Sequence, residues 1–277
     1  MINQLRTEAR QDGMILLRSR ILESIGVRHA FSTAEGPGGR LLDLSSPGGS
    51  HLGTRPEVLQ GDLDRFSTAV APEARLATPR QVHGSAVIDV QSADAAEADI
   101  VIAEPLEDPA DVMWMAAVRT ADCVPILLAC PRSGRVAAVH AGWRGLVADA
   151  PGVAIEQMLC RGSRTEELHV AIGPAIGLDR FEIGPEVATA MQQSGLAPAV
   201  QSRDPRPHAD LHRAARLRIL SAGVRESLVD GVEECTASSP RFFSHRRDDG
   251  ATGRHLAAII PGTPAGFGAR DMGSWQG

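Results

Sequence analysis

Two histidines and one cysteine stand in segments rich in glycine, proline and other turn-compatible residues, where strands commonly end. They are His83 in residues 81–84, Cys123 in residues 120–125 and His140 in residues 139–145. Cys123 follows His83 by 40 residues and precedes His140 by 17. Two imidazoles and a thiolate that leave a fourth position open are typical of a catalytic zinc site, whereas a structural zinc site has four protein ligands. The three residues therefore predict a metal centre that can do chemistry.

Each of these residues also has an ordinary structural interpretation. A free cysteine is most often a buried thiol in the core, and a histidine that closes a strand is often only a hydrogen-bonded part of the scaffold. Cys123 and His140 can also act together as a thiolate nucleophile and its general base, with no metal at all.

A basic residue accompanies His140. Arg144 lies in a turn bounded by Gly142 and Gly145, and a helical pattern over residues 146–160 follows it. A helix N-terminus with an arginine nearby is a natural site for an anion. Further along, residues 242–254 form a glycine-punctuated polar run with Arg246 and Arg247, which predicts contacts to phosphate or ribose hydroxyls. The alternative is a solvated loop whose charges neutralise one another.

A second pair of histidines has the spacing of a metalloprotease helix. His208 and His212 are four residues apart, but Ala209 stands where that motif needs its glutamate. We therefore expect an exposed helix face there, with Asp210 as the N-terminal cap.

Apolar runs and helical patterns supply the elements that must position these residues. Strands are expected at residues 86–90, 100–103, 112–118, 124–130, 136–140, 169–172 and 256–260, and helices at 55–70, 146–160, 185–194 and 210–222. Residues 131–135 are a short connection, which predicts that the fourth and fifth strands pair as an antiparallel hairpin. Pro151 must lie in a first turn or at a kink. A mixed-sheet α/β or α+β fold follows, and the absence of a dinucleotide fingerprint or P-loop disfavours a Rossmann fold.

Composition narrows the function classes. The chain has 277 residues, a formal net charge of −6, 43% hydrophobic residues and no tyrosine. The acidic balance disfavours a nucleic-acid partner, and no apolar run approaches the length of a membrane span. Residues 1–24 lack the apolar stretch of a signal peptide, and the four cysteines are widely spaced. We expect a reduced, cytoplasmic protein, with a long glycine-rich loop over residues 35–52.

Seven segments in this order resemble one family, the laccase-domain proteins. Its members were first described as multicopper polyphenol oxidases and were later reinterpreted as zinc-dependent purine nucleoside phosphorylases with adenosine deaminase activity. Some are named peptidoglycan editing factors. The matching segments span nearly the whole chain: residues 29–33, 81–84, 97–99, 120–125, 140–145, 172–174 and 242–254. The chain departs from the family pattern at Ala34, Asp43 and Ala175.

The resemblance implies a single α/β domain over residues 1–277, with mixed sheets flanked by helices and a topology like that of a cysteine-hydrolase toxin. It implies zinc held by His83, Cys123 and His140. It also implies phosphorolysis of adenosine, inosine, guanosine or methylthioadenosine to the base and ribose 1-phosphate, and hydrolytic deamination of adenosine. The expected partners are therefore a purine nucleoside and phosphate, with neither nucleic acid nor membrane.

Roles for individual residues follow from this chemistry. Zinc can lower the pKa of a coordinated water to about 7, and Asp122 is the candidate for the accompanying proton transfers. Arg144 is expected to hold phosphate, and Arg246, Arg247 and Gln81 complete the predicted substrate contacts. A Cys123–His140 hydrolase and an editing factor for peptidoglycan precursors remain alternatives. A copper oxidase is disfavoured, because its copper ligands normally include His-x-His pairs and this chain has none.

Overall fold

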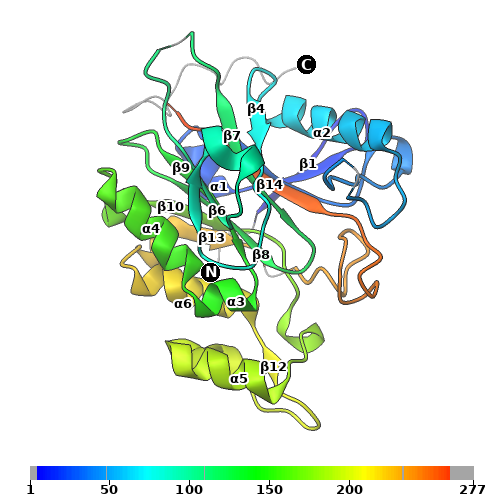
Figure 1. The fold of residues 1–277 in the computed structure, drawn as a ribbon, viewed down its shortest axis with the longest axis vertical. Helices are drawn as coiled ribbons and strands as arrows, with labels where there is room; N and C mark the ends of the chain where they lie inside the picture. Colours follow the sequence, from blue (N-terminus) through cyan, green and yellow to red (C-terminus); the bar gives the residue numbers. More distant parts are fainter. Residues whose placement is uncertain (1–4, 48, 109, 233, 263–277) are drawn as a thin grey trace.

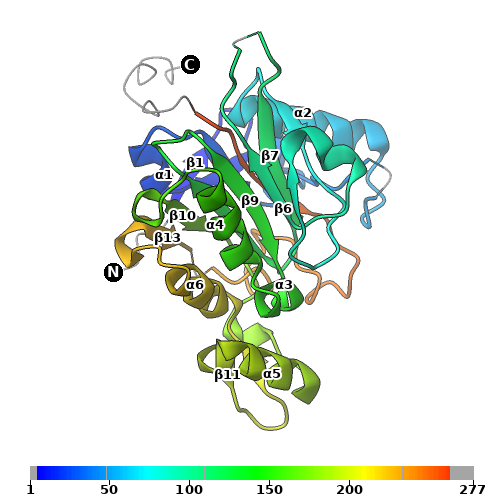
Figure 2. The same ribbon diagram turned by 60° about the vertical axis from the view of Figure 1, so that its left-hand side comes forward.

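Two six-stranded mixed sheets pack face to face, and helices cover their outer faces (Figures 1 and 2). The computed structural model describes residues 5–262 except 48, 109 and 233. None of the helices in these residues is long and apolar enough to cross a membrane.

The first sheet has the strand order β1-β2-β3-β14-β7-β4. Only the β4–β7 pair is parallel, and the other neighbours are antiparallel. Its strands are β1 (Arg6–Ala9), β2 (Ile15–Arg18), β3 (His29–Ser32), β4 (Arg75–Ala77), β7 (Trp114–Thr120) and β14 (His255–Ile259).

The second sheet has the order β13-β10-β8-β9-β6-β5, with parallel pairs at its two edges. Its strands are β5 (Val87–Asp89), β6 (Ile100–Ala103), β8 (Val124–Ala129), β9 (Val136–Ala141), β10 (His169–Ile172) and β13 (Val229–Gly231). A separate two-stranded ribbon joins β11 (Val200–Gln201) to β12 (His208–Ala209).

Most of the helices lie on the outer faces of the two sheets. The residues that the structure describes form six α-helices: α1 (Arg20–Ser24), α2 (Pro56–Val70), α3 (Trp143–Val147), α4 (Ala150–Cys160), α5 (Pro185–Met191) and α6 (Leu211–Ser221). Helix α2 lies on the first sheet, α3, α4 and α6 lie on the second, and α5 projects with β11 and β12 away from the sheets (Figures 1 and 2).

Alternation of side chains along the strands produces three apolar layers. On β7, Met115 packs toward α2 and Phe66, while Val118 packs between the sheets. On β8, Ile126 packs toward α4 and α6, while Leu127 packs between the sheets. Because successive side chains of a strand point to opposite faces, both faces of both sheets must be apolar. This requirement explains the continuous apolar runs in the sequence.

The mixed-sheet prediction is confirmed, and so is the antiparallel hairpin, which joins β8 to β9. All seven expected strands are present, with ends that move by up to two residues. The predicted cap is also confirmed, because the Asp210 carboxylate accepts a hydrogen bond from the backbone N–H of Arg213 at 2.9 Å.

The single helix predicted over residues 146–160 is wrong. Helix α3 ends at Val147, and α4 begins at Ala150 after a break at Asp149, whose φ is 57°. Pro151 has no N–H to continue the earlier helix, and the Asp149 carboxylate instead caps α4 at the Gly152 N–H. Arg218 of α6 donates to the carbonyls of Leu146 and Val147, so the broken end of α3 is satisfied.

Two further expectations in this region are corrected. Helix α5 ends at Met191 and passes into a π-helical turn that ends near Gly195, whose φ is 86°. His212 is buried rather than exposed, with Nε2 3.2 Å from the carbonyl of Gly173, and His208 lies on β12 rather than on a helix. The i, i+4 spacing misled because β12 ends at Ala209, and the helix begins only after Asp210.

The glycine-rich loop over residues 35–52 is tied to the sheet by Asp43. Its buried carboxylate accepts hydrogen bonds from the backbone and hydroxyl of Ser45, the hydroxyls of Ser50 and Thr54, and the backbone of Arg254. Burial by itself favours the neutral acid, but these donors outweigh it and lower the pKa of Asp43. The loop therefore has a fixed anchor at a position where the chain departs from the family pattern.

His255 makes the stability of the fold depend on pH. Burial lowers its pKa to about 4, and its Nε2 accepts a hydrogen bond from the Phe243 N–H at 2.8 Å. Between about pH 6.5 and pH 4 the unfolded chain binds this proton and the folded chain does not. The free energy of unfolding should therefore fall with falling pH by about 1.4 kcal/mol per pH unit from this residue.

Urea unfolding at several pH values measures this dependence. In His255→Asn, the free energy of unfolding should change less steeply between pH 6.5 and pH 4, by about 1.4 kcal/mol per pH unit, which is the contribution of one proton. His29 is also buried, with its pKa lowered to about 3 by burial and by Arg18, and it keeps its own contribution in this variant. Equal slopes for the wild type and the variant would contradict the assignment.

Candidate metal centre

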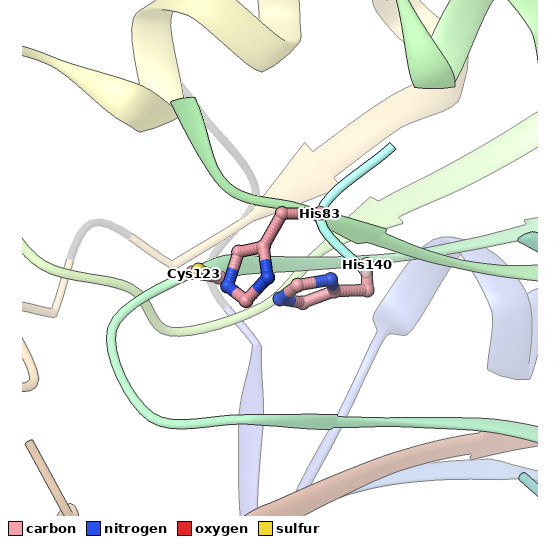
Figure 3. A group of neighbouring side chains, drawn as sticks. All are labelled: His83, Cys123 and His140. Carbon is pink, nitrogen blue, oxygen red and sulfur yellow. The ribbon is translucent and has the colours of Figure 1, made fainter. Parts of the chain in front are cut away.

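His83, Cys123 and His140 meet at one end of the second sheet (Figure 3). Cys123 directly precedes β8, His140 lies near the end of β9, and His83 lies in the segment before β5. One donor atom from each residue lies within 4.8 Å of the other two. The two imidazole centroids are 4.8 Å apart, with the rings nearly perpendicular at 79°. The structure thus brings together the three residues that the sequence singled out.

The donor set fits a zinc ion. Bond lengths of about 2.0–2.1 Å to nitrogen and 2.3 Å to sulfur place tetrahedral ligands about 3.3–3.6 Å apart. The observed limit of 4.8 Å needs only a small inward movement of side chains to reach that spacing. His83 is exposed, Cys123 is half-buried and His140 is buried, so the fourth position opens toward solvent.

Gly142 allows this close approach. A Cβ atom at this position would lie 2.9 Å from the Cys123 sulfur and 3.2 Å from Cδ2 of His83. Any larger residue would therefore push two of the three side chains apart. The turn that follows His140 must begin with glycine for a steric reason.

Two residues of the site region have left-handed backbone conformations that non-glycine residues rarely adopt. His83 has φ of 63°, and Asp122, next to Cys123, has φ of 91°. Such conformations persist only where the surroundings enforce them. At His83, the backbone N–H donates a hydrogen bond to the Asp99 carboxylate. At Asp122, the carboxylate of the residue itself accepts the Thr236 hydroxyl and the Arg246 N–H.

Asp99 is the residue of this site that sequence reasoning missed. Its buried carboxylate lies 2.7 Å from Nδ1 of His140 and accepts the backbone N–H groups of Val82, His83 and Gly84. In the sequence it appeared only within the family-like segment 97–99. The available signal was an acidic residue directly before the fully buried strand β6, a position that needs polar partners.

The electrostatics of the site favour a thiolate next to a protonated imidazole. Burial opposes ionisation of Cys123, but the rings of His140 and His83 outweigh it and lower the pKa of the thiol to about 6. Burial likewise opposes protonation of His140, yet the Cys123 thiolate and the Asp99 carboxylate raise its pKa to about 9. A thiolate is the form in which cysteine binds metals or attacks electrophiles.

Asp122 and Gln81 are held by neighbouring protein groups. The Asp122 carboxylate accepts the Thr236 hydroxyl at 2.6 Å and the Arg246 backbone N–H at 2.7 Å. The Gln81 amide donates to the carbonyl and accepts from the N–H of Arg119, both at 2.7 Å. These contacts connect Asp122 to the segment that contains Thr236 and Arg246, and Gln81 to Arg119 of β7. The catalytic role expected for Asp122 and the substrate-binding role expected for Gln81 stay predictions.

The three candidate arginines differ in how far they are engaged. Arg246 donates to the carbonyls of Arg180 and Glu182, and Arg247 donates to the carbonyls of Thr236, Ser239 and Phe242 and pairs with Asp248. Arg144 is exposed, and its guanidinium lies 4.4 Å from the ring centroid of Trp143. No hydrogen bond or ion pair of its side chain occurs among the described residues. Of the three candidates, Arg144 therefore has the most donors left for a ligand.

Comparisons with known proteins agree on one family. A family model described as "Multi-copper polyphenol oxidoreductase laccase" matches residues 28–261. A protein of Deinococcus radiodurans named purine nucleoside phosphorylase is 35% identical over 89% of this chain and 93% of its own length. The Escherichia coli protein named purine nucleoside phosphorylase YfiH is 36% identical over 76% of this chain and 84% of its own. The crystal structure of YlmD from Geobacillus stearothermophilus superposes with a TM-score of 0.77 at 28% identity, covering 93% of this chain and 98% of YlmD.

Proposed function

The chain belongs to the laccase family of multi-copper polyphenol oxidoreductases, and on that premise we propose that it is a zinc-dependent purine nucleoside phosphorylase. The observation that carries this proposal is the convergence of His83, Cys123 and His140, with donor atoms within 4.8 Å. The names of relatives at about 35% identity support the reaction class. We further infer that adenosine, inosine, guanosine or methylthioadenosine is phosphorolysed, and that adenosine is also deaminated by hydrolysis.

The residues of the site would hold the metal and keep it reactive. Cys123 would bind as the thiolate that its lowered pKa favours. His140 would use Nε2, because its Nδ1 faces Asp99. When bound, zinc supplies a Lewis acid and lowers the pKa of a coordinated water to about 7. The open side of the three-residue set would receive the substrate.

Phosphorolysis needs a group that holds phosphate while charge develops on the sugar and on the leaving purine. We assign this task to Arg144, which lies two residues after Gly142 in the turn that packs against the site, and whose exposed guanidinium rests on Trp143. A guanidinium binds phosphate oxygens in a bidentate manner, and Trp143 limits the orientations that it must lose on binding. Arg246 and Arg247 are assigned secondary contacts, because their Nη atoms already bind backbone carbonyls.

Deamination needs proton transfers to and from the purine. Asp122 is our candidate for these transfers, since it neighbours Cys123 in the chain. Its carboxylate accepts the Thr236 hydroxyl on one oxygen and the Arg246 N–H on the other, which leaves a lone pair on each oxygen for a proton.

A second candidate function is favoured by the carboxylate behind His140. Cys123, His140 and Asp99 would serve as the nucleophile, base and orienting carboxylate of a cysteine hydrolase. Such an enzyme would act on acyl substrates, and an editing role on peptidoglycan precursors belongs to this class. It should be inactivated by thiol alkylation and be indifferent to chelators.

Metal analysis of tag-free protein, paired with adenosine assays, separates these functions. About one zinc per chain, adenine formed only with phosphate, and inosine formed without it would support the nucleoside enzyme. Copper in place of zinc, with phenol oxidation, would favour the oxidase. Metal-free protein with a reactive Cys123 and no nucleoside turnover would favour the hydrolase.

A further inference from the structure

We propose that Asp99 is the positioning residue that fixes both metal-binding histidines, so that the metal affinity of the site depends on a carboxylate that never touches the metal. The inference rests on the proposed metal site at His83, Cys123 and His140. It adds a fourth residue, which orients the ligands rather than binding or reacting.

The pairing of two strands places Asp99 beside His140. Strands β6 and β9 are antiparallel neighbours with Ile100 opposite Val139, so Asp99 is opposite His140 in the same register. The main chains of the two residues are joined as well, because the His140 N–H donates to the Asp99 carbonyl at 2.8 Å. The backbone carbonyl and the side-chain carboxylate of Asp99 thus both hold His140 in place.

The side-chain contact selects one end of the imidazole for the metal. Nδ1 of His140 lies 2.7 Å from the Asp99 carboxylate, so this nitrogen carries the proton. The other nitrogen, Nε2, faces Cys123 and His83 and would give up its proton when the metal binds (Figure 3). A carboxylate behind a ligating histidine also makes the imidazole a stronger donor.

The same carboxylate shapes the turn that carries His83. Three successive backbone N–H groups, from Val82, His83 and Gly84, donate to its oxygens at 3.3, 3.0 and 2.6 Å. Successive N–H groups that converge on one anion form a concave nest. The left-handed conformation of His83, with φ of 63°, is part of this nest. Without the anion, the turn would lose the partner that holds its shape.

Asparagine cannot replace Asp99 in this arrangement. Its single carbonyl oxygen can serve His140 or the nest, but its NH₂ group would then face N–H donors. The carboxylate is fully buried, so water cannot repair the mismatch. Asp99→Asn should therefore weaken zinc binding by about 10- to 100-fold, the range found when an outer partner of a metal ligand is removed.

The test measures zinc affinity by competition with a chromogenic chelator, for the wild type, Asp99→Asn and a matched control. Asp230→Asn is that control, because Asp230 is equally buried and accepts the Ser19 hydroxyl and the Ile21 N–H, but lies on the edge strand β13. We expect weaker zinc binding for Asp99→Asn alone. Wild-type affinity in a folded Asp99→Asn would overturn the inference while leaving the proposed function in place, whereas a wild type without zinc affinity would remove both.

A measurement on the wild type keeps the inference testable if Asp99→Asn does not fold. Nitrogen-15 chemical shifts of the zinc-loaded protein identify which nitrogen of His140 is protonated. We expect a protonated Nδ1 and a metal-bound Nε2. Coordination through Nδ1 would overturn the inference.

Discussion

Replacing Cys123 with alanine should remove the metal and both nucleoside reactions together. Only the two imidazoles remain in Cys123→Ala, and the negative charge that the thiolate brings to a divalent cation is gone. We expect less than a tenth of the wild-type zinc content after dialysis, and turnover lower by about 1,000-fold, which corresponds to about 4 kcal/mol of transition-state stabilisation. Metal analysis and product chromatography of the same sample give both values.

Cys160→Ala is the matched control for this prediction. Cys160 is also a free cysteine, but it is exposed at the end of α4, away from the three-residue site. It should keep zinc and activity. Retention of both in Cys123→Ala would refute the metal site. If the wild type contains no metal and Cys123→Ala still loses turnover, the result would instead support the Cys123–His140 hydrolase.

Replacing Arg144 with alanine should separate the two reactions. Phosphorolysis consumes phosphate and hydrolytic deamination does not, so only the first needs the guanidinium. A charge-assisted hydrogen bond contributes about 1.5–3 kcal/mol, and kcat/KM for phosphate should therefore fall by about 10- to 100-fold. Deamination of adenosine without phosphate should keep its wild-type rate.

The control for Arg144→Ala is Arg213→Ala, which removes another exposed arginine in the first turn of a helix. It should leave both reactions unchanged. Equal losses of phosphorolysis and deamination in Arg144→Ala would show that the variant disturbs the whole site, and unchanged phosphorolysis would remove Arg144 from the phosphate role.

The parts of the fold that stand out most clearly from the sequence are its longer, continuously apolar strands. Strands β6, β8 and β9 are apolar on both faces, so their runs stand out from the sequence. Strand β1 was missed because it carries Arg6 and Glu8 on an exposed sheet edge, and its signal is that of a polar loop. Strands β2, β3, β4 and β13 were also missed, because each has only three or four residues, too few for a clear periodic pattern. The break between α3 and α4 was missed because its stabilising partner, Arg218, comes from a distant helix.

The residues of the site also differ in how clearly the sequence reveals them. The three proposed ligands could be singled out because histidine and cysteine beside turn residues are informative by type alone, and the family resemblance is confirmed. Asp99 could not be assigned this way, since its importance depends on the register between β6 and β9. The exposed state of Arg144, in contrast to Arg246 and Arg247, likewise depends on tertiary contacts.

Strand β14 has a consequence for how the chain is made. It lies between β3 and β7 in the first sheet, although it follows both by more than a hundred residues in the sequence. During synthesis, β3 and β7 must therefore wait with one open hydrogen-bonding edge each until residues 255–259 have left the ribosome. Pairing over such separations is slow and leaves edges that can join other chains. A chain whose synthesis stops before His255 should thus be prone to aggregation, even though it already contains His83, Cys123 and His140.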